Sequence, residues 1–313
     1  MPKESFNLGY NEIMELKIKI LSMDKRHCRL SFQNWTKSDI VVYEQVVCNF
    51  WRLIIFIKRM VIMKVLVIMG SLRKKNTYET IKKIENYHKQ YSNCEYEYLF
   101  LKDQNLKLCT GCHNCITKGE DLCPLKDDRD LIINKIEESD GIILASPTFS
   151  MNVTWIMKNF LDRLSYIMHR PKFFKQKFML LTVSGSIRGG KDTIRSLSFG
   201  AFGGKIISRL IILNSPGMNE NKRNKQENLL KKEVLKFSKN MEKKISLNPS
   251  FGFMMWFCAF KSMSIVYKNE CIADYNFYKD KNYFFDTKLT ALQNFLLKIF
   301  TGFFTLLVKK GLV

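Results

Sequence analysis

Four cysteines lie close together at a spacing that suits a metal cluster. They are Cys109, Cys112, Cys115 and Cys123, with two residues between the first three and seven before the fourth. Three thiolates in a tight loop with Gly111 can converge on one face of a cuboidal iron–sulfur cluster, and a later cysteine can supply the remaining corner. Structural zinc more often takes two separated pairs of ligands. The motif therefore favours a cluster, with zinc and free or redox-paired thiols as the alternatives.

Two neighbours of these cysteines could also do chemistry. His113 could replace a thiol ligand, but a histidine in such a loop is expected to face solvent. Asp127 and Asp128 could form a carboxylate pair, but Asp128 is better placed to cap the next helix. No nucleophile–histidine–acid set and no two-metal carboxylate set occurs in the sequence, so hydrolysis is not expected.

Charge and cysteine count limit the partners and the compartment. The chain has 51 Lys and Arg against 29 Asp and Glu, a net charge of +22, which favours anionic partners such as nucleotides, phosphates or acidic lipid. The basic residues are spread thinly and form no nucleic-acid-binding motif, so we expect no nucleic-acid binding. Nine cysteines are an odd number, and the N-terminus lacks a secretory signal, so we predict a reducing, cytoplasmic location.

Buried strands alternate with helices over the middle of the chain. The run from Lys64 to Met69 is continuously apolar after its first residue and stops at Gly70, as in a strand covered on both faces. Further strands are expected at 96–101, 141–145, 177–183 and 206–213, with helices at 76–91, 128–138, 152–168, 191–199 and 219–244. This alternation predicts an α/β fold, a flavodoxin-like doubly wound five-stranded parallel sheet in the order 2-1-3-4-5.

The loop after the first strand has the composition of a phosphate-binding loop. Ser71, Asn76 and Thr77 can donate hydrogen bonds, Arg73 adds charge, and the free N–H groups of the following helix point toward an anion. The loop is neither a Walker loop nor a G-x-G-x-x-G turn. The simpler alternative is that Ser71 and Asn76 only cap the helix.

Two more polar loops follow the third and fourth predicted strands. The candidate ligand-binding residues are Pro147, Thr148, Phe149, Ser150, Met151 and Asn152 in one loop, and Ser184, Gly185, Gly189 and Gly190 in the other. Ligands of open α/β sheets bind beyond the carboxyl ends of the strands. Three polar loops at that edge are therefore expected to surround a single ligand.

These loops resemble those of the flavodoxin-like NAD(P)H-dependent FMN reductases, and the cysteine spacing resembles the iron–sulfur flavoproteins within them. The resemblance covers residues 63–217 and includes the segment from Lys158 to Arg163. It implies that the first loop holds the FMN phosphate and that the other two flank the isoalloxazine ring. Phe149 either stacks on that ring or packs under its loop. The resemblance also implies a 4Fe–4S cluster on the four cysteines, and a homodimer.

The function implied is an NAD(P)H-dependent FMN oxidoreductase that passes electrons through a 4Fe–4S cluster to a small-molecule or ferredoxin-type acceptor. One alternative is an FMN-dependent quinone, nitro or azo reductase without a cluster. Another is a non-enzymatic electron carrier or redox sensor at a membrane surface.

The two ends of the chain lie outside this pattern. Residues 1–62 show no strand–helix alternation and are expected to be an extension, either disordered or not part of the functional polypeptide. Residues 63–247 are the predicted FMN-binding domain, with the cysteine-rich loop at 105–126. Residues 248–313 form an apolar extension, expected to be helical and to pack in a dimer or lie on a membrane surface.

Overall fold

The fold is an α/β sandwich around one parallel sheet. The computed structural model describes residues 62–245 and 247–312, so nearly all of the predicted N-terminal extension lies outside the described residues. The segment from Ile62 to the C-terminus forms one compact unit. Its strands are β1 (Met63–Met69), β2 (Cys94–Phe100), β3 (Gly141–Pro147), β4 (Lys177–Ser184) and β5 (Lys205–Leu213). They form a five-stranded parallel sheet in the order β2-β1-β3-β4-β5, which confirms the predicted fold.

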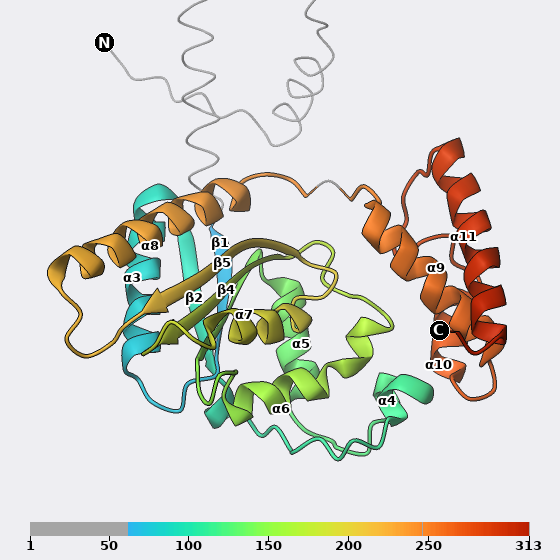
Figure 1. Ribbon diagram of the computed structural model, residues 1–313, viewed down its shortest axis with the longest axis horizontal. Coiled ribbons are helices and arrows are strands. Elements are labelled where there is room, and N and C mark those ends of the chain that lie inside the picture. The colour runs from blue at the N-terminus through green and yellow to red at the C-terminus, as the bar shows by residue number, and fades with distance from the viewer. Residues whose placement is uncertain (1–61, 246, 313) are drawn as a thin grey trace, which may run out of the picture. The chain divides into compact units, whose positions relative to one another are not determined.

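Helices cover both faces of the sheet (Figure 1). The larger ones are α3 (Asn76–Tyr91), α5 (Arg129–Glu138), α6 (Trp155–Arg163), α7 (Gly190–Phe199) and α8 (Glu220–Met241). Helices α3 and α8 lie on one face, and α5, α6 and α7 lie on the other. Short turns connect these elements: η2 (Leu101–Asp103), α4 (Asn114–Thr117), η3 (Glu120–Leu122) and η4 (Ser165–Met168).

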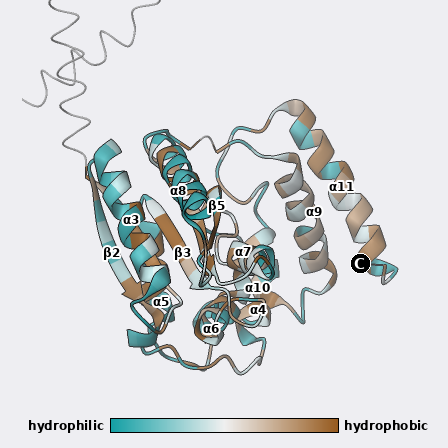
Figure 2. Ribbon diagram, turned by 60° about the vertical axis from the view of Figure 1, so that its left-hand side comes forward, coloured by the Kyte–Doolittle hydropathy of each residue, from teal (hydrophilic) through white to brown (hydrophobic). Residues whose placement is uncertain are grey.

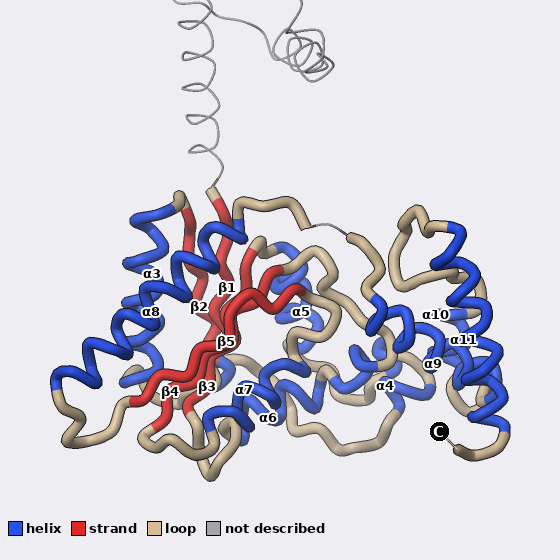
Figure 3. Tube along the Cα trace, turned by 45° about the horizontal axis from the view of Figure 1, so that its top comes forward, coloured by secondary structure: helices blue, strands red, loops and turns tan. Residues whose placement is uncertain are grey.

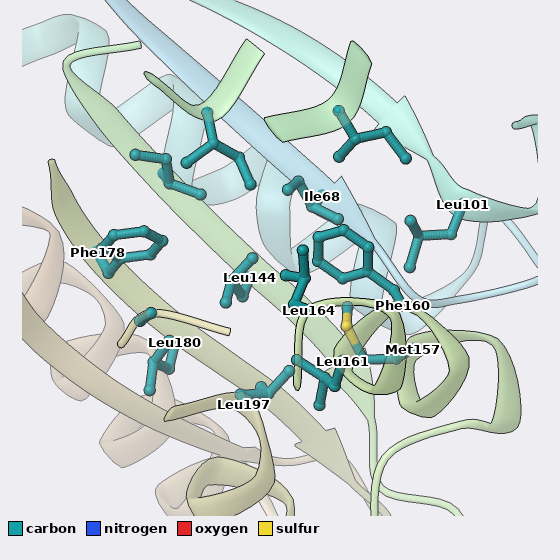
Figure 4. Packing of buried hydrophobic residues seen from close by; sticks show 14 of the residues in the cluster. Ile68, Leu101, Leu144, Met157, Phe160, Leu161, Leu164, Phe178, Leu180 and Leu197 are labelled. Atoms are coloured by element: carbon teal, nitrogen blue, oxygen red, sulfur yellow. The ribbon is translucent and has the colours of Figure 1, made fainter. Parts of the chain in front are cut away.

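The central strands β1, β3 and β4 are mainly apolar and buried because alternate residues serve two cores. Leu66 and Ile68 of β1 point into the core beneath α5, α6 and α7, where Phe160 lies (Figure 4). Val65 and Val67 point into the opposite core beneath α3 and α8. The pairing of β1 with β2 and β3 fixes its register, and Gly70 N donates to Ala145 O of β3 at 2.7 Å, which fixes the position of the loop that follows.

The helix predicted at 152–168 is shorter and broken in the structure. Asn152 exchanges backbone hydrogen bonds with Phe149 in a tight turn and so cannot begin a helix. Thr154 is the N-cap of α6, and its side chain accepts a hydrogen bond from Met157 N. Leu164 leaves helical geometry, and the chain continues as the 3-10 turn η4.

Three helices follow the sheet and form a third apolar core. They are α9 (Phe251–Val266), α10 (Ile272–Tyr278) and α11 (Ala291–Lys309), seen together in Figure 3. Trp256 Nε1 on α9 donates to Met168 O at 2.8 Å, and the Tyr278 hydroxyl on α10 donates to His169 O. The C-terminal helices are therefore attached to the sheet domain through the segment that follows α6.

Candidate functional site

A cavity of about 500 Å³ lies where the strands end, and all three predicted loops line it. The predicted residues that line it are Ser71, Arg73, Asn76, Thr77, Pro147, Thr148, Phe149, Ser184 and Gly185. Cofactor pockets are typically about 300–1,000 Å³. The cavity is therefore large enough for most of a mononucleotide cofactor.

The first loop presents the start of α3 to this cavity. The N-cap residue is Lys75, and no side chain caps the helix. The simpler alternative, that Ser71 and Asn76 only cap it, is therefore wrong. Ser71 Oγ instead donates to Arg73 O at 2.8 Å and so folds the loop on itself. Helix N–H groups without a capping side chain are suited to an anion such as a phosphate.

The second loop is a tight turn that carries an exposed aromatic ring. Ser150 and Met151 both have positive φ, at 46° and 67°, and Phe149 N donates to Asn152 O at 2.7 Å. Two central residues with positive φ are typical of a type I′ turn, although Gly or Asn is the usual choice. Phe149 is 64% exposed at the cavity, so it does not pack under its loop.

Ser150, Met151, Asn152, Gly189 and Gly190 do not line the cavity. Gly189 has φ of 82°, and a Cβ there would lie 2.7 Å from Met151 Cα. A Cβ on Gly190 would lie 2.8 Å from the Ile211 side chain. Gly189 therefore allows the third loop to pack tightly against the second, and Gly190 allows it to pack against β5. Both shape the cavity without lining it.

Five cavity-lining residues were not among the predicted ligands: Leu72, Lys75, Thr154, Val183 and Asn214. Asn214 directly follows β5, and the rule that selected the other loops applies equally to it. Thr154 could not be found in that way, because it reaches the cavity from the N-cap of α6. Its Oγ1 donates to Gly70 O at 2.6 Å and so joins α6 to the first loop.

Hydroxyl groups also join the second loop to the third. Thr148 Oγ1 lies 2.9 Å from Thr182 Oγ1 and 3.0 Å from Thr193 Oγ1. Asn214 N donates to Ser184 O at 2.8 Å, which ties the end of β5 to the end of β4. The loops are thus held to one another by hydrogen bonds of the protein itself, which fix the shape of the cavity.

A second, smaller cavity of about 50 Å³ is lined by all four predicted cysteine ligands, Cys109, Cys112, Cys115 and Cys123. His113 is exposed and has φ of 59°, in agreement with the expectation that it faces solvent. No three potential ligands among the described residues are close enough together to hold a single metal ion. The four thiols surround a space instead of meeting at one point.

Helix α6 holds the beginning of the cysteine loop. Cys109 N donates to Asn159 Oδ1 at 2.9 Å, and Asn159 Nδ2 donates back to Lys107 O at 3.2 Å. Asn159 is buried, so these bonds replace those it would make with water. Asp128 occupies the N-cap position of α5, but its carboxylate accepts from Asn105 N and does not cap the helix, contrary to prediction.

Arg163, at the end of α6, contacts the last cysteine. Its Nη1 donates to Cys123 Sγ at 3.0 Å, and its Nη2 donates to Asp127 Oδ1 at 2.8 Å. Burial opposes the charge of Arg163, but the hydrogen bonds to Cys123 and Asp127 raise its pKa. The guanidinium therefore stays charged beside the sulfur.

Two further buried arginines surround the same loop. Arg170 donates to the backbone carbonyls of Cys115 and Ile116, and it also pairs with Asp274 on α10. Arg129 lines the cysteine cavity, and its buried Nη1 has no hydrogen-bond partner in the described chain. A thiolate-bound cluster would supply negative charge and acceptors at this point, so the residues present fit such a group.

The thiols themselves differ in pKa. Burial raises the pKa of Cys115. Hydrogen bonding from the Asn114 backbone and from the Thr110 side chain lowers the pKa of Cys112. The loop therefore favours the thiolate form of Cys112, the exposed cysteine, and the thiolate is the form that binds metals.

The sheet order and the cavity at its carboxyl edge define a flavodoxin-like α/β protein. Residues 63–204 match the NADPH-dependent FMN reductase family. A curated relative named iron-sulfur flavoprotein, from Methanosarcina thermophila, is 33% identical over 138 residues, which cover 43% of this chain and 71% of the relative. The chain belongs to the NADPH-dependent FMN reductase family, whose members are flavoprotein oxidoreductases.

Other relatives with the same description match shorter shares of their length. One from Archaeoglobus fulgidus is 40% identical over 114 residues, which cover 35% of this chain and 49% of the relative. A second relative from that organism is 36% identical over 131 residues, which cover 42% of this chain and 63% of the relative. This chain thus spans only about half to two thirds of these relatives.

Solved structures with a similar chain trace include a flavone reductase and an NADH:FMN oxidoreductase. The first has a TM-score of 0.44 at 16% identity and covers 58% of this chain and 64% of that one. The second has a TM-score of 0.42 at 16% identity and covers 60% of this chain and 92% of that one.

Proposed function

We propose that this protein takes electrons from NADH or NADPH onto bound FMN and passes them through a 4Fe–4S cluster to a small-molecule or protein acceptor. The observation that carries the proposal is the position of α6. Its N-cap, Thr154, lines the loop cavity, and Arg163 at its other end lines the cysteine cavity. Arg163 is nine positions after Thr154, which is about 14 Å along a helix at about 1.5 Å per residue. One short helix therefore connects the two candidate cofactor sites.

In the first cavity, the chain's own residues would position FMN. Asn76, Thr77 and the start of α3 offer hydrogen-bond donors to a phosphate, and Arg73 adds a positive charge. Ser71 would hold the shape of this loop, because its hydroxyl donates to Arg73 O. Pro147, Phe149 and Gly185 line the remaining part of the cavity, where they would contact the ring. The exposed face of Phe149 is suited to stacking on a flat aromatic group.

In the second cavity, the four cysteines would bind iron as thiolates. Arg163 would donate to Cys123 Sγ, and Asn159 and Arg170 would hold the backbone on either side of the loop. Hydrogen bonds to ligand sulfurs and nearby positive charge favour the reduced, more negative form of a cluster.

When bound, the cofactors would supply the redox chemistry: FMN takes a hydride, with its two electrons, from NAD(P)H, and the cluster carries one electron at a time to the acceptor. Two electrons reach the acceptor for each NAD(P)H oxidised. The protein contributes placement, charge and the exclusion of water. We further propose that it acts as a cytoplasmic homodimer, which sedimentation equilibrium tests directly.

The proposal is tested by anaerobic purification followed by an absorption spectrum and by assays of FMN, iron and acid-labile sulfide. We expect bound FMN together with about four iron and about four sulfide ions per FMN, as one 4Fe–4S cluster requires, and oxidation of NADH or NADPH with a soluble acceptor. Flavin without iron would instead identify a quinone, nitro or azo reductase. Both cofactors without NAD(P)H oxidation would identify an electron carrier. Protein that binds no FMN even after incubation with it contradicts the whole proposal.

A further inference from the structure

Helix α11 exposes large apolar side chains along one face. Leu292, Phe295, Ile299, Phe303 and Leu306 are each between 48% and 66% exposed, and we call them the apolar stripe. They recur every three or four residues, so at about 100° per residue they fall within one arc of about 80°. An outward-facing helix surface is normally polar, so this arrangement needs another explanation.

The opposite face of α11 is already used for packing. Leu297 and Val308 are buried, and Leu297 belongs to the core that α11 shares with α9. Cys258 Sγ of α9 also contacts Leu297 O. The stripe is therefore additional to the apolar surface that the fold itself requires.

The helix as a whole is long and apolar. It has 19 residues and a mean hydropathy of 1.6, and only 11% of its apolar stretch is buried. Among the described residues it is the one helix that is long and apolar enough to cross a membrane. Figure 2 shows brown, apolar ribbon along most of α11 at the edge of the compact unit. A continuous apolar surface of this extent is uncommon on a monomer without a binding role.

Positive charge lies beside the stripe. Residues 287–313 contain four lysines, Lys288, Lys298, Lys309 and Lys310, and no acidic residue. Lys298 and Lys309 are exposed, and each follows a stripe residue by three positions, so both lie about 60° to the same side of the stripe. The stripe therefore has one basic edge.

We propose that α11 docks this protein on an anionic lipid bilayer, lying flat in the headgroup region. The stripe would enter the acyl boundary, and the lysines would meet lipid phosphates. A flat orientation allows Lys298 to extend its ammonium group to the headgroups, whereas a membrane-spanning orientation would place it near the bilayer centre. A second copy of the chain fits less well, because residues 287–313 of that copy contain no acidic side chain that could pair with the lysines. The docking does not depend on either cofactor.

The test is sedimentation of the full-length protein with vesicles. One set contains phosphatidylcholine alone, and the other contains phosphatidylglycerol at about 30 mol%, to reproduce an anionic surface. We expect binding to the anionic vesicles only, and its loss at about 0.5 M NaCl because salt screens the lysines.

Two variants separate the contributions of the stripe and its edge. F295Q/F303Q should weaken vesicle binding about tenfold or more. K298Q/K309Q/K310Q should weaken it on the order of 100-fold, since each lysine near the surface is worth about a fivefold change. Matched controls change exposed residues elsewhere: L131Q/F199Q for the apolar pair and K225Q/K232Q/K239Q on α8 for the lysines. The controls should bind as the wild type does, and circular dichroism should show that all four variants are folded.

Three results would overturn the proposal. The first is a wild-type protein that does not bind anionic vesicles, or a stripe variant that binds them unchanged. The second is a stripe variant that changes the sedimentation-equilibrium mass, which would assign the stripe to a second copy. The third is retention in vesicles after alkaline carbonate extraction, which would indicate a membrane-spanning helix.

Discussion

Arg163 donates through Nη1 to Cys123 Sγ at 3.0 Å and through Nη2 to both carboxylate oxygens of Asp127, at 2.8 and 2.9 Å. The two charged side chains are only 2% and 0% exposed. One guanidinium at the end of α6 therefore fixes two points of the cysteine loop. Because both charges are buried, each depends on the other for its stability.

Removing either member of this pair should be costly. We expect R163L and D127L each to lower the free energy of unfolding by about 3–5 kcal/mol, since the remaining charge is left buried without a partner. The double variant R163L/D127L should lose clearly less than the sum of the two. Urea unfolding of the four proteins, matched for iron content, measures this coupling. Additive losses would show that the pair does not act as a unit.

The two candidate cofactor sites should respond separately to substitution. Cys112→Ser should lose iron and retain most FMN, because Cys112 lines only the cysteine cavity. Cys271→Ser is the matched control, since Cys271 is half-buried and lines neither cavity. Iron and FMN are measured on anaerobically purified material. Equal loss of both cofactors in Cys112→Ser would contradict two distinct sites.

The same separation should hold in the other direction. Arg73→Ala should weaken FMN binding by about 1–3 kcal/mol, the scale of a charge-assisted hydrogen bond, and leave the iron content unchanged. Arg195→Ala is the control, because Arg195 is exposed and pairs with Asp192 on α7. Fluorescence titration of FMN into the apoprotein gives both affinities. An unchanged affinity in Arg73→Ala would remove this side chain from the phosphate site.

The fold was predictable because burial on both faces leaves a clear pattern in the strands. β1 and α3 were predicted to within one residue. The four cysteines predicted to act together, Cys109, Cys112, Cys115 and Cys123, line one cavity. What could not be predicted depends on contacts between distant segments. Asn159 and Arg170 reach the cysteine loop only after α6 and η4 pack beside it. The short helix α10 has no periodic pattern of its own and is positioned through Asp274.

The predicted loops also divided into residues that line the cavity and residues that shape it, which composition alone does not distinguish. Gly189→Ala should destabilise the protein by about 1–3 kcal/mol, because a non-glycine residue is strained at positive φ. The added Cβ would also lie 2.7 Å from Met151 Cα. FMN affinity should therefore fall, because the second loop is displaced. Gly185→Ala is the control for unfolding, since a Cβ there meets nothing within 4 Å. Equal unfolding free energies for the two variants would contradict the close approach.

The last prediction concerns His88, a buried histidine between α3 and the sheet. The side chain is fully buried, its Nδ1 lies 2.8 Å from the Tyr96 hydroxyl, and its Nε2 has no partner in the described chain. Burial lowers the pKa of His88 to about 4. In the unfolded chain the pKa is about 6.5, so below that pH the unfolded state takes up a proton that the folded state does not. The free energy of unfolding should therefore fall as the pH drops from about 6.5 to about 4.

Between pH 7 and pH 5 we expect His88 to account for a loss of about 2 kcal/mol, which His88→Leu should abolish. Glu85→Gln is the control. Burial raises the pKa of Glu85, but hydrogen bonds from Lys82, Lys89 and Tyr98 outweigh this and lower it to about 2. The contribution of Glu85 to the free energy of unfolding is therefore lost only below about pH 4.5. Glu85→Gln should accordingly lose as much stability as the wild type between pH 7 and pH 5. Urea unfolding at the two pH values measures each difference. A His88→Leu protein with the same pH dependence as the wild type would show that His88 is not held neutral in the folded state.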